Sequence, residues 1–133
     1  MSRYRVKNDL QRVEFWAKDD QRAFRPLLDL PENISEEDKK QYTQDHFVFK
    51  HPTWDKVALM HTVATGSGMT PFVDDKQLDK LLLKYFLVEA SFFDLETKTD
   101  EDGMEFADNI DQFLSEVYPA LIDFIILNIR QRM

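Results

Sequence analysis

The sequence contains no cysteine. Disulfide bonds, zinc–thiolate sites and thiol nucleophiles are therefore excluded for this chain. A small secreted domain usually depends on such cross-links, because its hydrophobic core is too small to stabilise the fold alone. The absence of cysteine thus favours a protein of the reducing cytosol.

Glycine and proline are also scarce, with three and five occurrences in 133 residues. Sandwiches and barrels need frequent turn residues between short strands, so this composition disfavours them. Eleven Phe, two Trp and four Tyr supply enough apolar area for a packed core. We predict a single domain over residues 1–133 that is mainly α (α+β), with about three to five helices and a short β element near the N-terminal half.

Long hydrophobic runs are absent as well. The longest apolar stretch, Val117 to Ile129, is interrupted by Pro119, Asp123 and Asn128. It falls short of the roughly 20 residues that a membrane-spanning helix requires. The sequence begins MSRYRVKNDL, with charges where a secretory signal would have an apolar segment. We therefore expect no membrane span, no export and a cytoplasmic location.

Acidic residues outnumber basic ones by 25 to 17, which gives a formal net charge of −8. Sequence-independent binding to DNA or RNA depends on Lys and Arg that neutralise phosphates, so we expect no direct nucleic-acid binding. The first 25 residues reverse the balance, with seven basic and four acidic side chains. This basic start is either an arm for an acidic partner or neighbouring subunit, or an ordinary solvated segment.

Local patterns in the first half predict two strands and two helices. In the basic segment 1–30, alternating Val13, Phe15 and Ala17 favour extended structure over helix. Ser35, followed by three acidic residues, predicts an N-cap and a short polar helix to about residue 43. The stretch 46–50 predicts a strand. Pro52 ends it, and the sequence after it predicts a helix as far as about residue 66.

The clearest helical pattern begins after Asp74 or Asp75 and continues to residue 92. Its apolar face is formed by Leu78, Leu81, Leu82, Tyr85, Leu87, Val88 and Phe92. The stretch after it is rich in acidic residues and predicts a solvated loop. If Gly103 were the turn glycine of a calcium loop, Lys98 would replace the first aspartate and Asn109 the bidentate glutamate, so the calcium motif fails.

The last predicted helix begins near Glu105 and must kink or restart at Pro119. Residues 121–129 are apolar on almost every side, so this helix is either the central core helix or in part a contact surface for a second subunit or client. The loop GSGMTPFV over 66–73 offers further anchors or exposed contacts. The candidate partner-binding residues are Met69, Phe72, Leu121, Phe124, Ile125 and Leu127.

Motifs of catalysis are missing from the sequence. His46, His51 and His61 form no HExxH or other paired-ligand spacing. A nucleophile elbow, a phosphate-binding glycine loop and a dinucleotide fingerprint are also absent. We therefore predict that the protein is not an enzyme and uses no metal or cofactor.

Residues 46–133 resemble small tail-assembly chaperones and accessory virion proteins of tailed bacteriophages. The resemblance lies in an apolar strand that runs into a Pro-Thr-Trp helix start, and in an Asp-capped, Leu-rich helix that is followed by an acidic stretch and an apolar helix. The matching positions are Phe47, Phe49, Pro52, Thr53, Trp54, Asp75, Leu78, Leu81, Leu82 and Leu87. The resemblance implies a cytoplasmic assembly factor or minor virion part that shields or joins apolar surfaces of tail proteins.

Two alternatives remain from the same composition. A small acidic protein can mimic nucleic acid and inhibit a host nuclease or defence complex, with Glu96, Asp100, Glu101 and Asp102 in place of phosphates. Alternatively, the chain is an oligomeric part of a larger assembly, with the last helix as the interface. Salt separates the first alternative from the others, because screening weakens charge-based binding much more than apolar contact.

Overall fold

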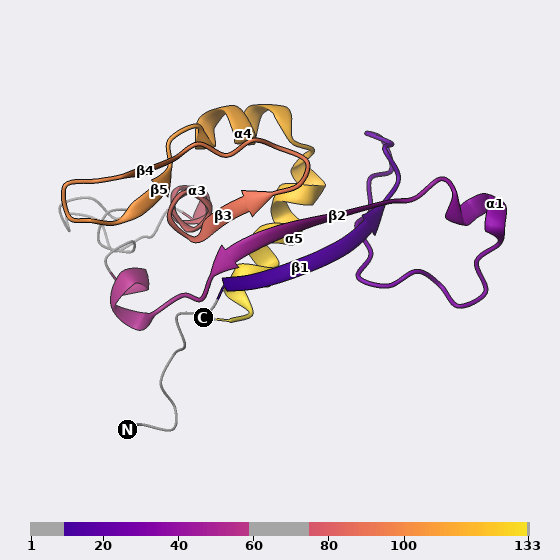
Figure 1. Ribbon diagram of the computed structural model, residues 1–133, viewed down its shortest axis with the longest axis horizontal. Helices are drawn as coiled ribbons and strands as arrows, with labels where there is room; N and C mark the ends of the chain where they lie inside the picture. Colours follow the sequence, from indigo (N-terminus) through magenta and orange to yellow (C-terminus); the bar gives the residue numbers. More distant parts are fainter. Residues whose placement is uncertain (1–9, 59–74, 133) are drawn as a thin grey trace, which may run out of the picture.

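The computed structural model describes residues 10–58 and 75–132. Within them the elements follow in the order β1 (Leu10–Ala17), α1 (Glu36–Lys39), β2 (Thr43–Lys50), α3 (Asp75–Phe86), β3 (Leu87–Ala90), β4 (Thr97–Thr99), β5 (Glu105–Ala107), α4 (Ile110–Glu116) and α5 (Pro119–Arg130) (Figure 1). Residues 54–58 are also helical. No helix of the described ranges has the length and apolar character needed to cross a bilayer.

The expectation of a mainly α protein is wrong. The chain is an α+β mixture with 37% helix and 26% strand, and the described strands form two sheets. The larger sheet has the order β1-β2-β3, and the smaller one pairs β4 with β5. Several of these strands are too short to produce a recognisable alternation in the sequence, which explains why the strand content was underestimated.

The larger sheet is antiparallel, and its core face is aromatic. Strand β1 buries Val13, Phe15 and Ala17 at alternate positions, as expected for a strand with one face covered. Val13 pairs with Phe47 of β2, and the β2–β3 register shifts after Val48. The extended structure predicted around residues 13–17 is thus confirmed, and the strand predicted over 46–50 begins earlier, at residue 43.

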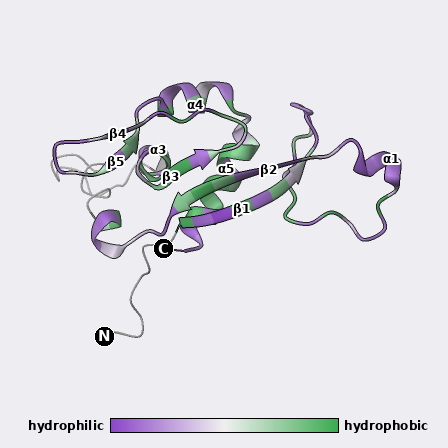
Figure 2. Cartoon of the chain, in the orientation of Figure 1, coloured by the Kyte–Doolittle hydropathy of each residue, from purple (hydrophilic) through white to green (hydrophobic). Residues whose placement is uncertain are grey.

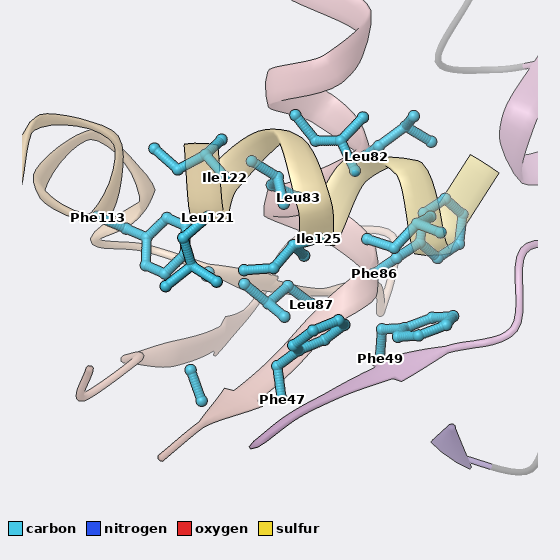
Figure 3. Packing of buried hydrophobic residues seen from close by; sticks show 14 of the residues in the cluster. Phe47, Phe49, Leu82, Leu83, Phe86, Leu87, Phe113, Leu121, Ile122 and Ile125 are labelled. Carbon is cyan, nitrogen blue, oxygen red and sulfur yellow. The ribbon is translucent and has the colours of Figure 1, made fainter. Parts of the chain in front are cut away.

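Helices α3 and α5 cover one face of this sheet (Figure 1). Figure 3 shows Phe47 and Phe49 of β2 beneath Leu87 and Ile125, with side chains of α3 and α4 completing the cluster. In Figure 2 the apolar colour is densest on α5 and on part of β2 and alternates with polar colour along β1, while α1 is largely polar. The core therefore joins the sheet to helices from the second half of the chain.

The helix predicted to reach residue 92 ends at Phe86, and this part of the prediction is wrong. The chain continues directly as β3, in which Leu87 and Ala90 pair with Phe49 and Phe47 of β2. Both β3 residues are buried. Strand pairing satisfies the backbone of this segment and buries its apolar side chains, which outweighs its helical periodicity.

The acidic stretch is a β-hairpin rather than an irregular loop. Strands β4 and β5 pair antiparallel, and the Asp100 carboxylate accepts hydrogen bonds from the backbone amides of Asp102 (3.0 Å) and Met104 (2.9 Å). Gly103 adopts φ +81° in this turn, a conformation that favours glycine. Residues 105–107 are therefore strand, and the helix predicted from Glu105 begins only at Ile110.

Asn109 ties this hairpin to the start of α4. Its side-chain amide donates to the carbonyl oxygen of Asp94 (2.8 Å), and its side-chain oxygen accepts from the amide of Glu96 (2.9 Å). The pair of bonds fixes the chain just before β4 to the residue just before α4. This short link explains how an acidic, polar segment is held against the core.

Helix boundaries follow their local sequence signals at two other places. Ser35 caps α1, because its Oγ accepts from the amide of Asp38 at 3.2 Å, although α1 ends at Lys39 and not near residue 43. Pro119 begins a new helix instead of kinking the old one: α4 ends at Glu116, and Pro119 stands in the first turn of α5. Proline suits that position because its missing N–H would have no helical partner there.

Candidate functional site

The six candidate contact residues lie in different environments. Met69 and Phe72 fall outside the described residues. Leu121 and Ile125 are buried, with 5% and 0% exposure, so both belong to the core. Phe124 is half-buried and packs edge-on against Phe15 and Phe47, with ring centroids 5.8 and 6.1 Å apart.

Of the four candidate residues that the structure describes, Leu127 has the most accessible side chain, at 54% exposure. Its neighbours on the exposed stripe of α5 are Ala120, Asp123 and Arg130. Asn128, on the buried side, donates to the carbonyl oxygen of Phe124 at 2.8 Å and so satisfies its amide within the helix. Helix α5 is therefore mainly a core helix, and its exposed stripe carries a single large apolar side chain.

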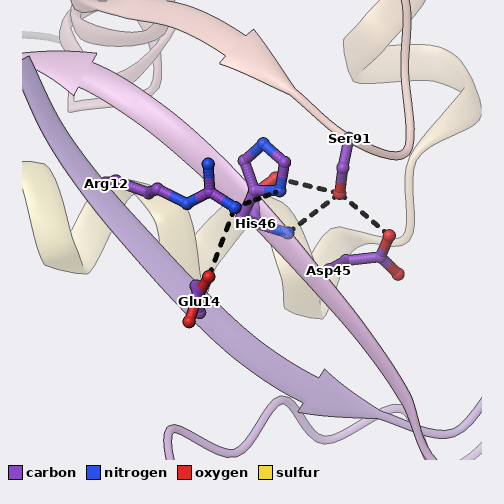
Figure 4. Close-up of polar contacts among 5 residues, drawn as sticks. All are labelled: Arg12, Glu14, Asp45, His46 and Ser91. Atoms are coloured by element: carbon purple, nitrogen blue, oxygen red, sulfur yellow. Dashed lines mark hydrogen bonds and ion pairs between the residues drawn. The ribbon is translucent and has the colours of Figure 1, made fainter.

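A serine, a histidine and an aspartate meet at the end of β3, but not in a catalytic arrangement (Figure 4). Ser91 Oγ donates to Asp45 (2.9 Å) and accepts from the backbone amide of His46 (2.8 Å). The His46 ring instead lies 3.4 Å from Arg12, through its Nδ1 atom. Because the imidazole does not contact the serine oxygen, the three side chains do not form a Ser-His-Asp triad, and the hydrogen bonds of Ser91 join β2 to the end of β3.

Metal ligation finds no support in the part of the chain that the structure describes, because those residues contain no group of three or more His, Asp or Glu side chains that could hold an ion. Two carboxylates in and beside the acidic hairpin form ion pairs with lysines instead. Lys50 contacts Glu105 at 3.0 Å, and Lys98 contacts Asp108 at 2.8 Å. The Asp108 carboxylate raises the pKa of Lys98 by accepting its hydrogen bond and by its charge.

A concave site does exist at the end of the larger sheet. We call it the end-of-sheet pocket; its volume is about 440 Å³, and it opens to solvent. Its floor is formed by β1 and β2, at the end where these strands run beyond α5 (Figure 1). Its walls are the segment after β1, the turn after β3 and the α4–α5 junction. The lining residues are Phe15, Ala17, Lys18, Asp19, Phe24, Thr43, Asp45, Phe92, Glu116, Val117, Tyr118 and Leu121.

Aromatic rings form much of the pocket wall. Phe24 meets Tyr118 edge to face, with centroids 5.1 Å apart and planes at 68°. Phe15 meets Phe92 in the same manner, at 5.9 Å and 76°. Phe24, Phe92 and Tyr118 are all half-buried, so their rings are in part accessible from the pocket.

A hydrogen bond between Tyr118 and Asp19 closes one side of the pocket. The Tyr118 hydroxyl donates to Asp19 at 2.5 Å and so links the start of α5 to the segment after β1, 99 positions apart in the sequence. Asp19 raises the pKa of Tyr118, because the bond favours the protonated phenol and its charge disfavours a phenolate. This contact holds the otherwise peripheral segment 18–24 against the body of the protein.

The pocket rim is acidic. Asp19, Asp45 and Glu116 contribute three carboxylates, and Lys18 contributes one ammonium group, which lies 5.0 Å from the centroid of the Tyr42 ring. Each carboxylate accepts a hydrogen bond from a neutral donor: the Tyr118 hydroxyl, the Ser91 hydroxyl or the Gln112 amide. None of the three forms an ion pair with another described residue, so their negative charges remain uncompensated there.

Sequence patterns did not indicate this pocket, because its residues come from segments separated by up to more than a hundred positions. The available signals were indirect: the alternation of Phe15 and Ala17 identified the core face of β1, and Pro119 identified the break before α5. Neither signal shows that the strands extend past the end of the helix that covers them.

Comparisons with known proteins found no matching family model, no matching curated protein and no matching solved structure.

Proposed function

We propose that this protein is a non-catalytic protein-binding module, and that its end-of-sheet pocket receives a side chain from the partner. The supporting observation is the set of partly exposed aromatic rings at this end of the sheet. Phe24, Phe92 and Tyr118 are half-buried and line an open cavity of about 440 Å³. Burial of such apolar surface by a partner contributes favourable free energy to binding, because it removes the surface from water.

The shape of the pocket favours part of a macromolecule over a free small molecule. Small-molecule sites usually enclose most of their ligand, whereas this cavity is open to solvent. Its rim consists of a connecting segment and a helix junction, which offer additional surface to a polypeptide. A protein that inserts one side chain would cover both the pocket and its rim.

The resemblance to phage tail-assembly factors gives this proposal a concrete setting. In that setting the module would be an assembly factor or minor virion component, and tail proteins would be the first partners to test. The partner can also be a second copy of the chain, in which case the protein forms a homo-oligomer. The acidic-mimic alternative loses one of its four carboxylates, because that of Asp100 accepts hydrogen bonds from backbone amides, and the neighbouring Glu105 and Asp108 are paired with lysines.

Site-specific photo-crosslinking tests the proposal. A photoreactive phenylalanine is placed at Thr43, an exposed pocket residue, or at Glu37, an exposed residue of α1. Each variant is produced in cells together with the products of the neighbouring genes. The expected result is a defined adduct from position 43 and none from position 37.

Binding of the purified partner then gives the quantitative test. Thr43→Trp, which fills the pocket, should weaken the affinity at least about tenfold, whereas Glu37→Trp should leave it unchanged. Leu127→Asp tests the exposed stripe of α5 as the rival surface. Full affinity in a folded Thr43→Trp variant, or loss of binding only in Leu127→Asp, would refute the pocket as the recognition site.

A further inference from the structure

We infer that the end-of-sheet pocket selects an organic cation: the ammonium or guanidinium group of a Lys or Arg side chain that the protein partner presents. This inference rests on the proposed function and specifies its ligand. It is carried by the coincidence of two features in one cavity, an aromatic wall and an uncompensated acidic rim.

The aromatic wall suits the stem and the charge of such a side chain. Phe24 and Tyr118 stand at 68° to each other, and both rings are half-buried, as is the ring of Phe92. Rings at steep angles form corners, and a group that enters a corner meets the face of one ring and the edge of the other. Ring faces carry negative electrostatic potential and attract ammonium and guanidinium groups, while the apolar stem of Lys or Arg packs on the same surface.

The rim supplies the charge. Asp19, Asp45 and Glu116 each accept one hydrogen bond from a neutral group and keep further lone pairs for a cationic donor. An ionised carboxylate forms stronger hydrogen bonds with a charged donor than with a neutral one. With Lys18 as the one basic residue of the lining, the pocket has two more negative than positive side chains.

A second cavity of the same volume lacks this combination. It lies between α3 and α5 and is about 440 Å³ in size, but its apolar residues are Leu83, Leu114, Ile122 and others without an aromatic ring. Its charged residues are two lysines and two aspartates, which balance. This cavity therefore has no preference for a cation, and the inference is confined to the end-of-sheet pocket.

Lys18 gives the inference an internal check. Its ammonium group lies 5.0 Å from the centroid of the Tyr42 ring, and Lys18 is itself a lining residue of the end-of-sheet pocket. A cation in the pocket would be repelled by this charge. Replacing Lys18 with the uncharged Met should therefore tighten cation binding about two- to threefold.

Titration of the full chain with short blocked peptides, followed by amide NMR, tests the selectivity. The peptides Ac-Gly-Ala-X-Ala-Gly-amide carry Lys, Arg or norleucine at X; norleucine keeps the apolar stem of Lys and lacks its charge. The Lys and Arg peptides should shift the amides of Ala17, Asp19, Thr43 and Val117 in a saturable manner. The norleucine peptide should bind at least about tenfold more weakly, and added salt should reduce that difference.

Charge-removing variants complete the test. Asp19→Asn combined with Asp45→Asn should weaken binding of the Lys peptide about tenfold, whereas Glu37→Gln on α1 should not change it. A well-dispersed amide spectrum of each variant shows that it is folded. Asn keeps a hydrogen-bond acceptor at both positions, so loss of binding would report loss of charge.

The outcomes separate this inference from the proposed function. If norleucine binds as tightly as Lys, or if no peptide shifts the pocket amides while a partner still crosslinks at position 43, the cation inference is wrong and the pocket remains a protein-binding site. If neither peptides nor partner engage the pocket, both proposals are wrong.

Discussion

Truncation of Phe124 tests the orientation of α5 on the sheet. The Phe124 ring lies against Phe15 and Phe47, with centroid distances of 5.8 and 6.1 Å, and belongs to the partly buried groups packed on the core. Phe124→Ala would remove both edge-to-face contacts and leave a cavity between helix and sheet. Such truncations in protein cores cost about 3–5 kcal/mol, and the partial exposure of Phe124 places the expected loss near the lower value, about 3 kcal/mol.

Leu127 provides a matched control on the same helix. Its side chain is 54% exposed, so Leu127→Ala should change the free energy of unfolding by no more than about 0.5 kcal/mol. Both variants retain a good helix former at the substituted position.

Equilibrium unfolding in urea, followed by far-UV circular dichroism, measures both values. A loss below about 1 kcal/mol for Phe124→Ala, or a comparable loss for Leu127→Ala, would show that α5 does not bury the face assigned to it. The comparison also decides between a core role and a contact role for these two residues, because a contact residue contributes to binding and not to the stability of the isolated chain.

Three further predictions concern the acidic half of the chain. Lys80 holds the pKa of Asp111 below its ordinary value of 3.8 through an ion pair at 2.7 Å, so this pair stabilises the fold above pH 3.8 and the effect is lost as the pH falls through the lowered pKa. In Lys80→Gln, carboxyl NMR titration should show the Asp111 pKa rising toward 3.8. An unchanged pKa would contradict the pairing. Gly103→Ala should lower the free energy of unfolding, measured by thermal unfolding, by about 1 kcal/mol, because a side chain disfavours φ +81° even though no atom lies within 4 Å of the added carbon. An unchanged stability would contradict the turn geometry. Asn109→Ala removes two hydrogen bonds to the backbone before β4 and should lower the free energy of unfolding by about 1–2 kcal/mol. Amide hydrogen exchange in the hairpin should become faster. Unchanged exchange would show that these two bonds are dispensable.

The sequence by itself determined the features that depend on neighbouring residues. Ser35 and Pro119 mark helix starts through their own side chains, and the alternation of Val13, Phe15 and Ala17 gives one face of a strand. These signals act within a few residues. They identified a helix cap, a helix break and an extended segment.

Tertiary structure decided the features in which distant segments compete or combine. Residues 87–90 continue a helical pattern, yet they form β3 because pairing with β2 satisfies their backbone and buries Leu87 and Ala90. The apolar residues of α5 likewise fit either a core or an interface, and only packing on the sheet and α3 places Leu121 and Ile125 inside and Leu127 outside. A local pattern gives the periodicity of a segment but not the surface that will cover it.

The end-of-sheet pocket depends on tertiary structure entirely. Asp19 and Tyr118 are 99 positions apart, and their hydrogen bond exists because β1 ends and α5 begins at the same side of the molecule. The pocket arises where β1 and β2 run beyond the start of α5, and there the half-buried rings of Phe24, Phe92 and Tyr118 lie beside carboxylates from other segments. The relative placement of elements creates this combination of apolar surface and charge, and no single stretch of the sequence encodes it.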